Sequence, residues 1–167
     1  MEDVKAVEDS ASSISPAQSG SVEQILVAAG AKGTPRVAVE RVLAVTGKGL
    51  EGDRYFGRRP GRYAADRQVT LIEAEAVDAV RAGGVPFTAV DARRNLVTRG
   101  VRLNALVGRT FRVGGAVLRG VELCHPCGHL AKLTYRGVTR DLKMRGGLRA
   151  AVLEGGEIRA GDALAEV

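Results

Sequence analysis

The feature that most restricts the fold of this chain is a series of short apolar runs, separated by glycine-containing or charged stretches. The runs are too short for ordinary helices and are rich in β-branched residues, so they predict strands. They lie within residues 22–28, 36–45, 68–72, 91–97, 110–113, 116–123, 147–153 and 163–167. About eight such strands predict a mainly-β protein, a closed or partly open β-barrel.

One strong helical pattern interrupts the strands, at residues 73–82. It is acidic at its start, rich in alanine, and followed by Gly83-Gly84, which predicts the one longer helix of the fold. Shorter helical turns are expected at 103–107 and 130–133. The helix is expected to pack on the barrel.

The turns and the N-terminal composition predict the domain organisation. Residues 1–19 are rich in serine, alanine and acidic residues and have no apolar periodicity, which predicts a disordered tail followed by one domain over residues 20–167. Gly114-Gly115 predicts a hairpin between the strands on either side. A second hairpin is expected between the runs at 22–28 and 36–45.

Both cysteines and both histidines of the chain lie in the stretch Cys124-His125-Pro126-Cys127-Gly128-His129. A structural zinc site would need a second, distant ligand pair, and c-type haem attachment would need a histidine in place of Gly128. A thioredoxin-like dithiol would lie near the start of a helix after an early strand, whereas these cysteines come late, after short strands. Haem attachment is excluded and a structural zinc site is disfavoured. Three further interpretations are open: a redox dithiol, two buried inert cysteines, and a thiolate that binds a metal centre or carries sulfur.

The charge balance indicates what kind of partner the chain binds. It has 25 Lys and Arg against 19 Asp and Glu, a formal net charge of +6, which favours anionic partners. Aromatic residues make up only 4% of the chain and Trp is absent. Because stacking platforms and recognition motifs for nucleic acid are lacking, nucleic acid is not expected as a partner. A phosphorylated small molecule or cofactor fits the charge.

Three stretches contain arginines that could approach an anion. Residues 47–54 contain three glycines but lack the spacing of a phosphate-binding P-loop, so the stretch predicts either a flexible turn or a loop that brings backbone N–H groups and Arg54 towards an anion. Residues 57–66 are basic and predict a mobile segment. Arg93-Arg94-Asn95 leads into an apolar strand, which turns one arginine inward, where it would need an anionic partner.

Targeting signals are not seen in the sequence. No signal-peptide pattern follows Met1, and no apolar run approaches the roughly 18 residues of a membrane-spanning helix. Together with only two cysteines, this predicts a soluble cytoplasmic protein with no membrane contact.

Four stretches, in order, resemble the motifs of the MOSC family, which is named after the C-terminal domain of molybdenum-cofactor sulfurase. The similarity spans about residues 36–167. The stretches are Gly49-Leu50-Glu51-Gly52-Asp53-Arg54, Arg93-Arg94-Asn95-Leu96-Val97-Thr98-Arg99-Gly100, Cys124-x-Pro126-Cys127, and Arg145-Gly146-Gly147-Leu148-Arg149-Ala150 with Gly155-Gly156-x-Ile158-x-x-Gly161-Asp162.

The resemblance implies a β-barrel domain that binds molybdenum or delivers sulfur to metal-sulfur centres. The family's invariant cysteine corresponds to Cys127, which is thereby the expected metal ligand or sulfur-bearing nucleophile, with His129 as a hydrogen-bonding group or proton relay. The implied cofactor is the molybdenum cofactor (molybdopterin), and the implied partner is that cofactor or an acceptor protein for a metal-sulfur cluster. Where standalone relatives often have histidine, this chain has Tyr55. Pyridoxal phosphate is not expected, since nothing before residue 36 could hold the aminotransferase-like domain of the full-length sulfurase.

The expected cofactor-binding residues at the family-matching positions are Arg54, Arg93, Arg94, Asn95 and Arg149. Guanidinium groups bind phosphate in a planar, bidentate way. Because strand ends on one rim of a small barrel lie close together, at least two of the four arginines are expected to converge at the mouth of the pocket that holds Cys127. The competing interpretations are a non-catalytic anion-binding or interaction module and a Cys-x-x-Cys dithiol redox protein.

Overall fold

The computed structural model describes residues 17–57 and 68–167. The strands are β1 (Ser19–Val27), β2 (Val37–Val39), β3 (Arg41–Val45), β4 (Gly49–Leu50), β5 (Val69–Glu73), β6 (Leu96–Arg99), β7 (Thr110–Val113), β8 (Ala116–Leu123), β9 (Leu148–Glu154), β10 (Gly156–Arg159) and β11 (Ala163–Glu166). The helices are α1 (Ala74–Ala82), α2 (Ala89–Ala92), the 3₁₀ turn η1 (Leu103–Leu106), α3 (Gly128–Leu133) and α4 (Val138–Asp141).

Seven strands close into a barrel in the order β11-β7-β8-β9-β5-β6-β1, and the ring is completed where β1 pairs with β11. Neighbouring strands are antiparallel except β5 and β6, which are parallel and are joined through α1 and α2. β2 extends the sheet beyond β1, and β10, β3 and β4 form a second, smaller sheet. The predicted mainly-β barrel with one longer helix is therefore confirmed.

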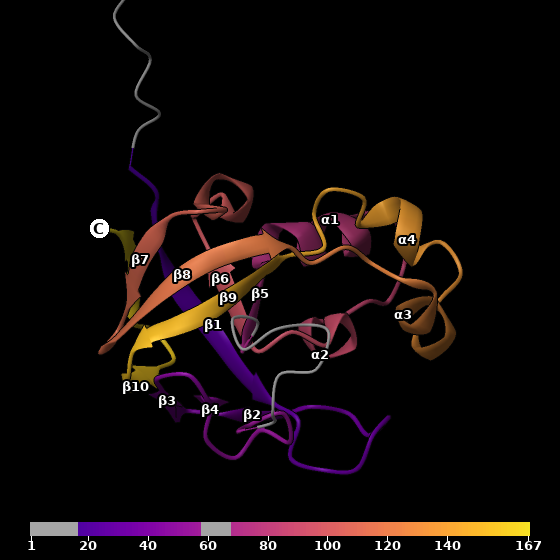
Figure 1. Ribbon diagram of the computed structural model, residues 1–167. Coiled ribbons are helices and arrows are strands. Elements are labelled where there is room, and N and C mark those ends of the chain that lie inside the picture. Colours follow the sequence, from indigo (N-terminus) through magenta and orange to yellow (C-terminus); the bar gives the residue numbers. More distant parts are fainter. Residues whose placement is uncertain (1–16, 58–67) are drawn as a thin grey trace, which may run out of the picture.

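Several strands are apolar on both faces because they separate two cores. Ile25 of β1 and Leu71 of β5 pack inside the barrel, while the adjacent Leu26 and Ile72 pack in a second cluster with residues of α1, α3 and α4. Successive side chains of a strand point to opposite faces, so these runs line the inner and the outer wall in turn. Figure 1 shows helices α1 to α4 gathered on one side of the barrel. The helices thus cover one outer wall, beside which the site described below lies.

Some local predictions need correction. The run at 36–45 divides at Glu40: β2 pairs with β1, as the predicted hairpin requires, but β3 joins the smaller sheet. Strand β10 begins at Gly156, in a stretch for which no strand is predicted, and pairs with β3. β1 begins at Ser19, inside the predicted tail, because that residue pairs with Ala165 of β11. Residues 1–16 and 58–67, which hold most of the predicted tail and mobile segment, lie outside the described residues.

Within the described residues, no helix combines the length and the apolar character that crossing a membrane requires.

Candidate functional site

A pocket of about 310 Å³ lies beside the outer wall of the barrel, where the loops after β4 and β8 and the segment before β6 meet. The thiol of Cys127, the expected reactive group, lines it together with His129. Five arginines also line it, and none of its described lining residues is acidic. The five are Arg36, Arg54, Arg93, Arg94 and Arg149.

The floor of the pocket is formed by outward-facing side chains of the barrel. Leu71 and Leu148 belong to the inner core, so their neighbours Thr70 and Arg149 point outward. These two residues are cross-strand partners in β5 and β9, and Arg149 also lies opposite Glu122 of β8. Arg149 Nε is 3.5 Å from Glu122 Oε1, in a solvent-accessible ion pair. The arginines thus share a pocket as expected, but on the wall of the barrel rather than at its rim, because strand alternation sets the direction of Arg149.

The two cysteines differ in their exposure to solvent. Cys124 directly follows β8, donates its backbone N–H to the carbonyl of Gly147 at 2.7 Å, and has only 3% of its surface exposed. Cys127 is exposed, and α3 begins directly after it, two residues earlier than the predicted helical turn. The interpretation of two buried, inert cysteines is therefore wrong for Cys127.

The described residues contain no group of three or more His, Cys, Asp or Glu side chains that could hold a metal ion.

The cysteine-containing loop rests on the backbone of Gly146. A Cβ atom at this position would lie 2.2 Å from the carbonyl oxygen of Cys124 and 2.8 Å from Cδ of Pro126. The carbonyl of Gly146 accepts a hydrogen bond from Arg94 Nε at 2.9 Å. Gly146 thus connects the loop to an arginine of the pocket.

We expect Gly146→Ala to displace the loop of Cys124 and Cys127, because the added methyl group meets backbone atoms that cannot move independently. The expected loss is about 1–3 kcal/mol of unfolding free energy, measured by urea denaturation. Gly128→Ala is the matched control, since a Cβ there would meet nothing within 4 Å. Equal stability of the two variants would show that the loop does not depend on close packing at Gly146.

Arg94 is the inward arginine that the sequence predicts, with 9% of its surface exposed. Nε donates to Gly146 and Nη1 donates to the carbonyl of Ala92 at 3.2 Å, so these partners are carbonyl groups rather than the expected anionic group. Burial lowers the pKa of Arg94, Arg149 lowers it further, and the nearby thiols of Cys124 and Cys127 oppose the shift. Arg94 therefore brings a positive charge close to both cysteines.

Arg93 reaches the pocket from the end of α2. It adopts a left-handed backbone conformation with a φ of 58°, and its Nη1 donates to the carbonyl of Thr34 at 3.3 Å.

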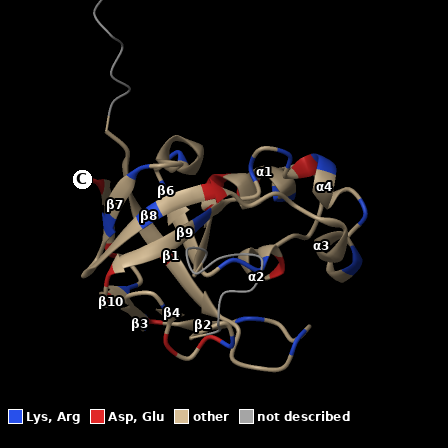
Figure 2. Ribbon diagram, in the orientation of Figure 1, with Lys and Arg blue, Asp and Glu red and all other residues tan. Residues whose placement is uncertain are grey.

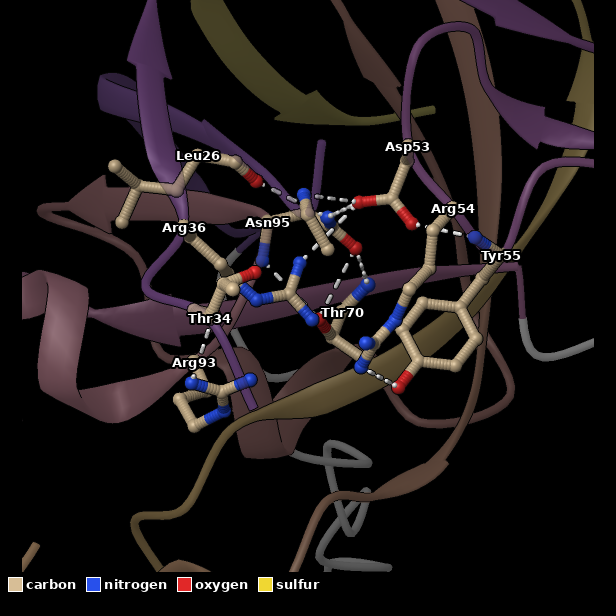
Figure 3. Close-up of polar contacts among 10 residues, drawn as sticks. Leu26, Thr34, Arg36, Asp53, Arg54, Tyr55, Thr70, Arg93 and Asn95 are labelled. Atoms are coloured by element: carbon tan, nitrogen blue, oxygen red, sulfur yellow. Dashed lines mark hydrogen bonds and ion pairs between the residues drawn. The ribbon is translucent and has the colours of Figure 1, made fainter. Parts of the chain in front are cut away.

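A buried carboxylate, Asp53, organises the side of the pocket shown in Figure 3. Its Oδ2 accepts from the backbone N–H of Ala28 at 2.9 Å, from Arg36 Nη1 at 3.3 Å and from Asn95 Nδ2 at 3.0 Å. Its Oδ1 accepts from the backbone N–H of Tyr55 at 3.0 Å. Sequence analysis did not single out Asp53 or Arg36, although Asp53 lies in the first of the family-like stretches.

Asn95, expected to contact the cofactor, uses its amide within the protein. Besides Asp53, its Nδ2 donates to the carbonyl of Leu26 at 3.1 Å. Its Oδ1 accepts from the backbone N–H of Thr70 at 3.1 Å and from the Thr70 hydroxyl at 3.2 Å. With both N–H groups and both acceptor positions engaged, the Asn95 amide is suited to join β1 and β5 and shape the pocket wall.

Arg54 and Tyr55, which both line the same pocket, contact each other. Arg54 Nη2 donates to Tyr55 Oη at 2.7 Å, and the guanidinium carbon lies 4.8 Å from the centre of the tyrosine ring. The tyrosine that replaces the usual histidine therefore holds an arginine in place. Of the two histidines in the chain, His129 lines the pocket and His125 does not.

The distribution of charge distinguishes this site from the rest of the surface. Figure 2 shows Lys and Arg on the barrel strands and on the helical side alike, so the net charge alone does not locate a site. The site is located instead by five arginines that line one pocket together with the exposed Cys127. These features define the class of the protein: a small β-barrel domain with an arginine-lined, thiol-containing pocket.

The chain belongs to the MOSC family, because the model of the MOSC domain matches residues 58–165. The stretch from Gly49 to Arg54 lies before the matched range. No curated protein matches the sequence.

Solved structures share the fold at low sequence identity. The YUAD protein from Bacillus subtilis is 17% identical, with a TM-score of 0.78 over 90% of this chain and 96% of its own. YiiM from Geobacillus stearothermophilus is 17% identical, with a TM-score of 0.67 over 89% of this chain and 75% of its own. YiiM from Escherichia coli is 22% identical, with a TM-score of 0.64 over 87% of this chain and 69% of its own.

Proposed function

We propose that the arginine-lined pocket binds the molybdenum cofactor, with Cys127 as a thiolate ligand of the metal or as the carrier of sulfur destined for a metal-sulfur centre. The observation that carries the proposal is the presence of an accessible thiol and five arginines in one pocket. Membership of the MOSC family, which is associated with molybdenum-cofactor sulfurase, supports it.

The donor groups fit this cofactor. The molybdenum cofactor carries a phosphate and an anionic metal-dithiolene group. Guanidinium groups suit the phosphate, and a soft thiolate suits a metal already bound to sulfur. Two of the pocket arginines, Arg36 and Arg54, have buried N–H groups without a partner, which match the oxygen atoms of an anion. When bound, the cofactor supplies a metal centre that exchanges sulfur.

Each protein group has a distinct role in this proposal. Cys127 presents its sulfur to the pocket, while Arg94 keeps a positive charge beside it and attracts anionic groups to that end. His129 is exposed and lines the pocket, so it is placed to pass a proton between a bound group and solvent. Asn95 and Asp53 hold the wall in shape.

Sulfur transfer to Cys127 would need only a donor persulfide and no separate oxidant or reductant. The Cys127 thiolate attacks the terminal sulfur of a donor persulfide, a new S–S bond forms at Cys127, the donor's S–S bond breaks, and the donor leaves as a thiolate. Delivery of this sulfur, as sulfide, to the cofactor or to a protein that holds a metal-sulfur centre would also take a second thiol, whose thiolate attacks Cys127 Sγ, forms a disulfide with it and releases the outer sulfur as hydrosulfide. We place this activity in the cytoplasm, where two free cysteines stay reduced.

The test is to identify what Cys127 carries in the purified protein. Cyanide releases carried sulfur as thiocyanate, and acid oxidation converts the pterin of the cofactor into a fluorescent product. We expect one of these signals in the wild type and neither in Cys127→Ser. Reversible formation of a disulfide between Cys124 and Cys127, with neither signal, would contradict the proposal and support the dithiol redox alternative.

A further inference from the structure

Within the described part of the chain, two buried side-chain polar atoms have no hydrogen-bond partner, and both belong to arginines of the pocket. They are Nε of Arg36 and Nη1 of Arg54. Buried polar groups in folded proteins are nearly always paired, and unpaired charged donors are especially costly. Two such donors in one pocket indicate a site that is completed by a ligand.

Arg36 is held firmly by the protein. Its side chain is only 8% exposed, and its Nη1 donates to Asp53 Oδ2 at 3.3 Å. Burial lowers the pKa of Arg36, Asp53 opposes this shift, and the charge of Arg93, which lines the same pocket, lowers the pKa further. Asp53 therefore orients the Arg36 guanidinium while Nε stays unused.

Arg54 is held by a different contact. Its Nη2 donates to the hydroxyl of Tyr55, whose ring also lies against the guanidinium. This leaves Nη1 as the unpaired donor. Because both arginines are already positioned, a ligand that pairs with them would lose little side-chain entropy on binding.

We propose that Arg36 and Arg54 form a subsite for the phosphate group of a phosphate monoester. Three lining arginines, Arg36, Arg54 and Arg93, lie on the side of the pocket that Asp53 organises (Figure 3), and three positive charges minus one negative charge leave +2 there. A phosphate monoester carries about −1.5 to −2 at neutral pH and has three terminal acceptor oxygens, so it can meet both unpaired donors and balance the charge. A carboxylate, with one negative charge, would balance only half of the +2 charge.

The subsite deepens the proposed function, and it rests on that function only in assigning the phosphate to the molybdenum cofactor. The donors would bind the phosphate group of any ligand that fits the pocket. Arg36 is outside the family-like stretches, so this assignment depends on its contacts in the structure.

The test is isothermal titration of the purified protein, freed of bound ligands, with inorganic phosphate at constant ionic strength. We expect Arg36→Gln and Arg54→Gln each to weaken binding by about tenfold or more, because each removes a charged donor to the phosphate. Arg112→Gln, an exposed arginine of β7 outside the pocket, makes the same charge change and should weaken binding by less than about twofold. An equal loss in all three variants, or no measurable binding by the wild type, would overturn the subsite.

Two further variants separate the subsite from folding and from the proposed function. Arg54→Gln leaves the ion pair between Arg36 and Asp53 in place. A loss of phosphate binding by this variant, with an unchanged thermal unfolding temperature, therefore cannot be attributed to misfolding. Cys127→Ser should retain phosphate binding while losing the cofactor or sulfur. Phosphate binding by a wild-type protein that never carries cofactor or sulfur would refute the proposed function alone, and phosphate binding unaffected by Arg36→Gln and Arg54→Gln in a protein that carries cofactor or sulfur would refute the subsite alone.

Discussion

Replacing Cys127 with serine is expected to abolish binding of the molybdenum cofactor, whereas Cys124→Ala should retain most of it. Serine offers a hard, protonated oxygen in place of a soft thiolate, and it cannot carry a persulfide. Loss of a group that only supports a metal ligand typically costs about 10- to 100-fold in affinity, so loss of the ligand itself should cost more. Cys124 is buried beside the strand end, so its replacement removes packing rather than the accessible sulfur.

The measurement is co-elution of pterin fluorescence with each variant in gel filtration after incubation with the isolated cofactor. Circular dichroism of both variants controls for folding. Equal loss of the cofactor in Cys127→Ser and Cys124→Ala would indicate a site that uses both thiols and would contradict the assignment of Cys127 as the single functional cysteine.

The second large effect is expected for Asp53→Asn. The side chains of Arg36 and Asp53 are 8% and 5% exposed, and removing one member of a buried ion pair leaves the other charge without compensation. We expect a loss of about 3–5 kcal/mol in unfolding free energy. The substitution also puts an amide where Ala28, Asn95 and Tyr55 donate hydrogen bonds to a carboxylate.

Urea denaturation at neutral pH measures this effect, with Glu157→Gln as the control. Glu157 pairs with Arg159 on the surface, where its side chain is 43% exposed, and the loss of such a pair costs at most about 1 kcal/mol. If the two variants were equally stable, Asp53 would not be the organising group of the pocket.

The barrel was predictable because its strands have local signals. Gly114-Gly115 marks a hairpin, which the structure places between β7 and β8. The apolar runs of β1 and β5 are continuous because each separates two cores. The division of residues 36–45 was not predictable, because both halves read as strand and only tertiary pairing sends β2 and β3 to different sheets.

The site was predictable where residues matched family motifs and not where a role depends on tertiary contacts. Cys127 and four of the arginines line one pocket as expected, while their roles in binding stay predictions. The place of Arg36 in the site was not predicted, because its guanidinium is oriented by Asp53, which is 17 residues away in the sequence. A signal was present, since Arg36, like Arg94, precedes a run of apolar strand residues.

The most direct test of the central claim is the molar ratio of molybdenum to protein after purification of the wild-type chain from a host supplied with molybdate. Mass spectrometry gives the ratio of molybdenum to protein, which tests Cys127 as a ligand of the cofactor. Pterin and thiocyanate are measured on the same sample, and thiocyanate released by cyanide tests Cys127 as a sulfur carrier. The account predicts molybdenum with pterin, or cyanide-releasable sulfur, in amounts comparable to the protein. A folded protein that contains neither molybdenum nor releasable sulfur under these conditions would contradict it.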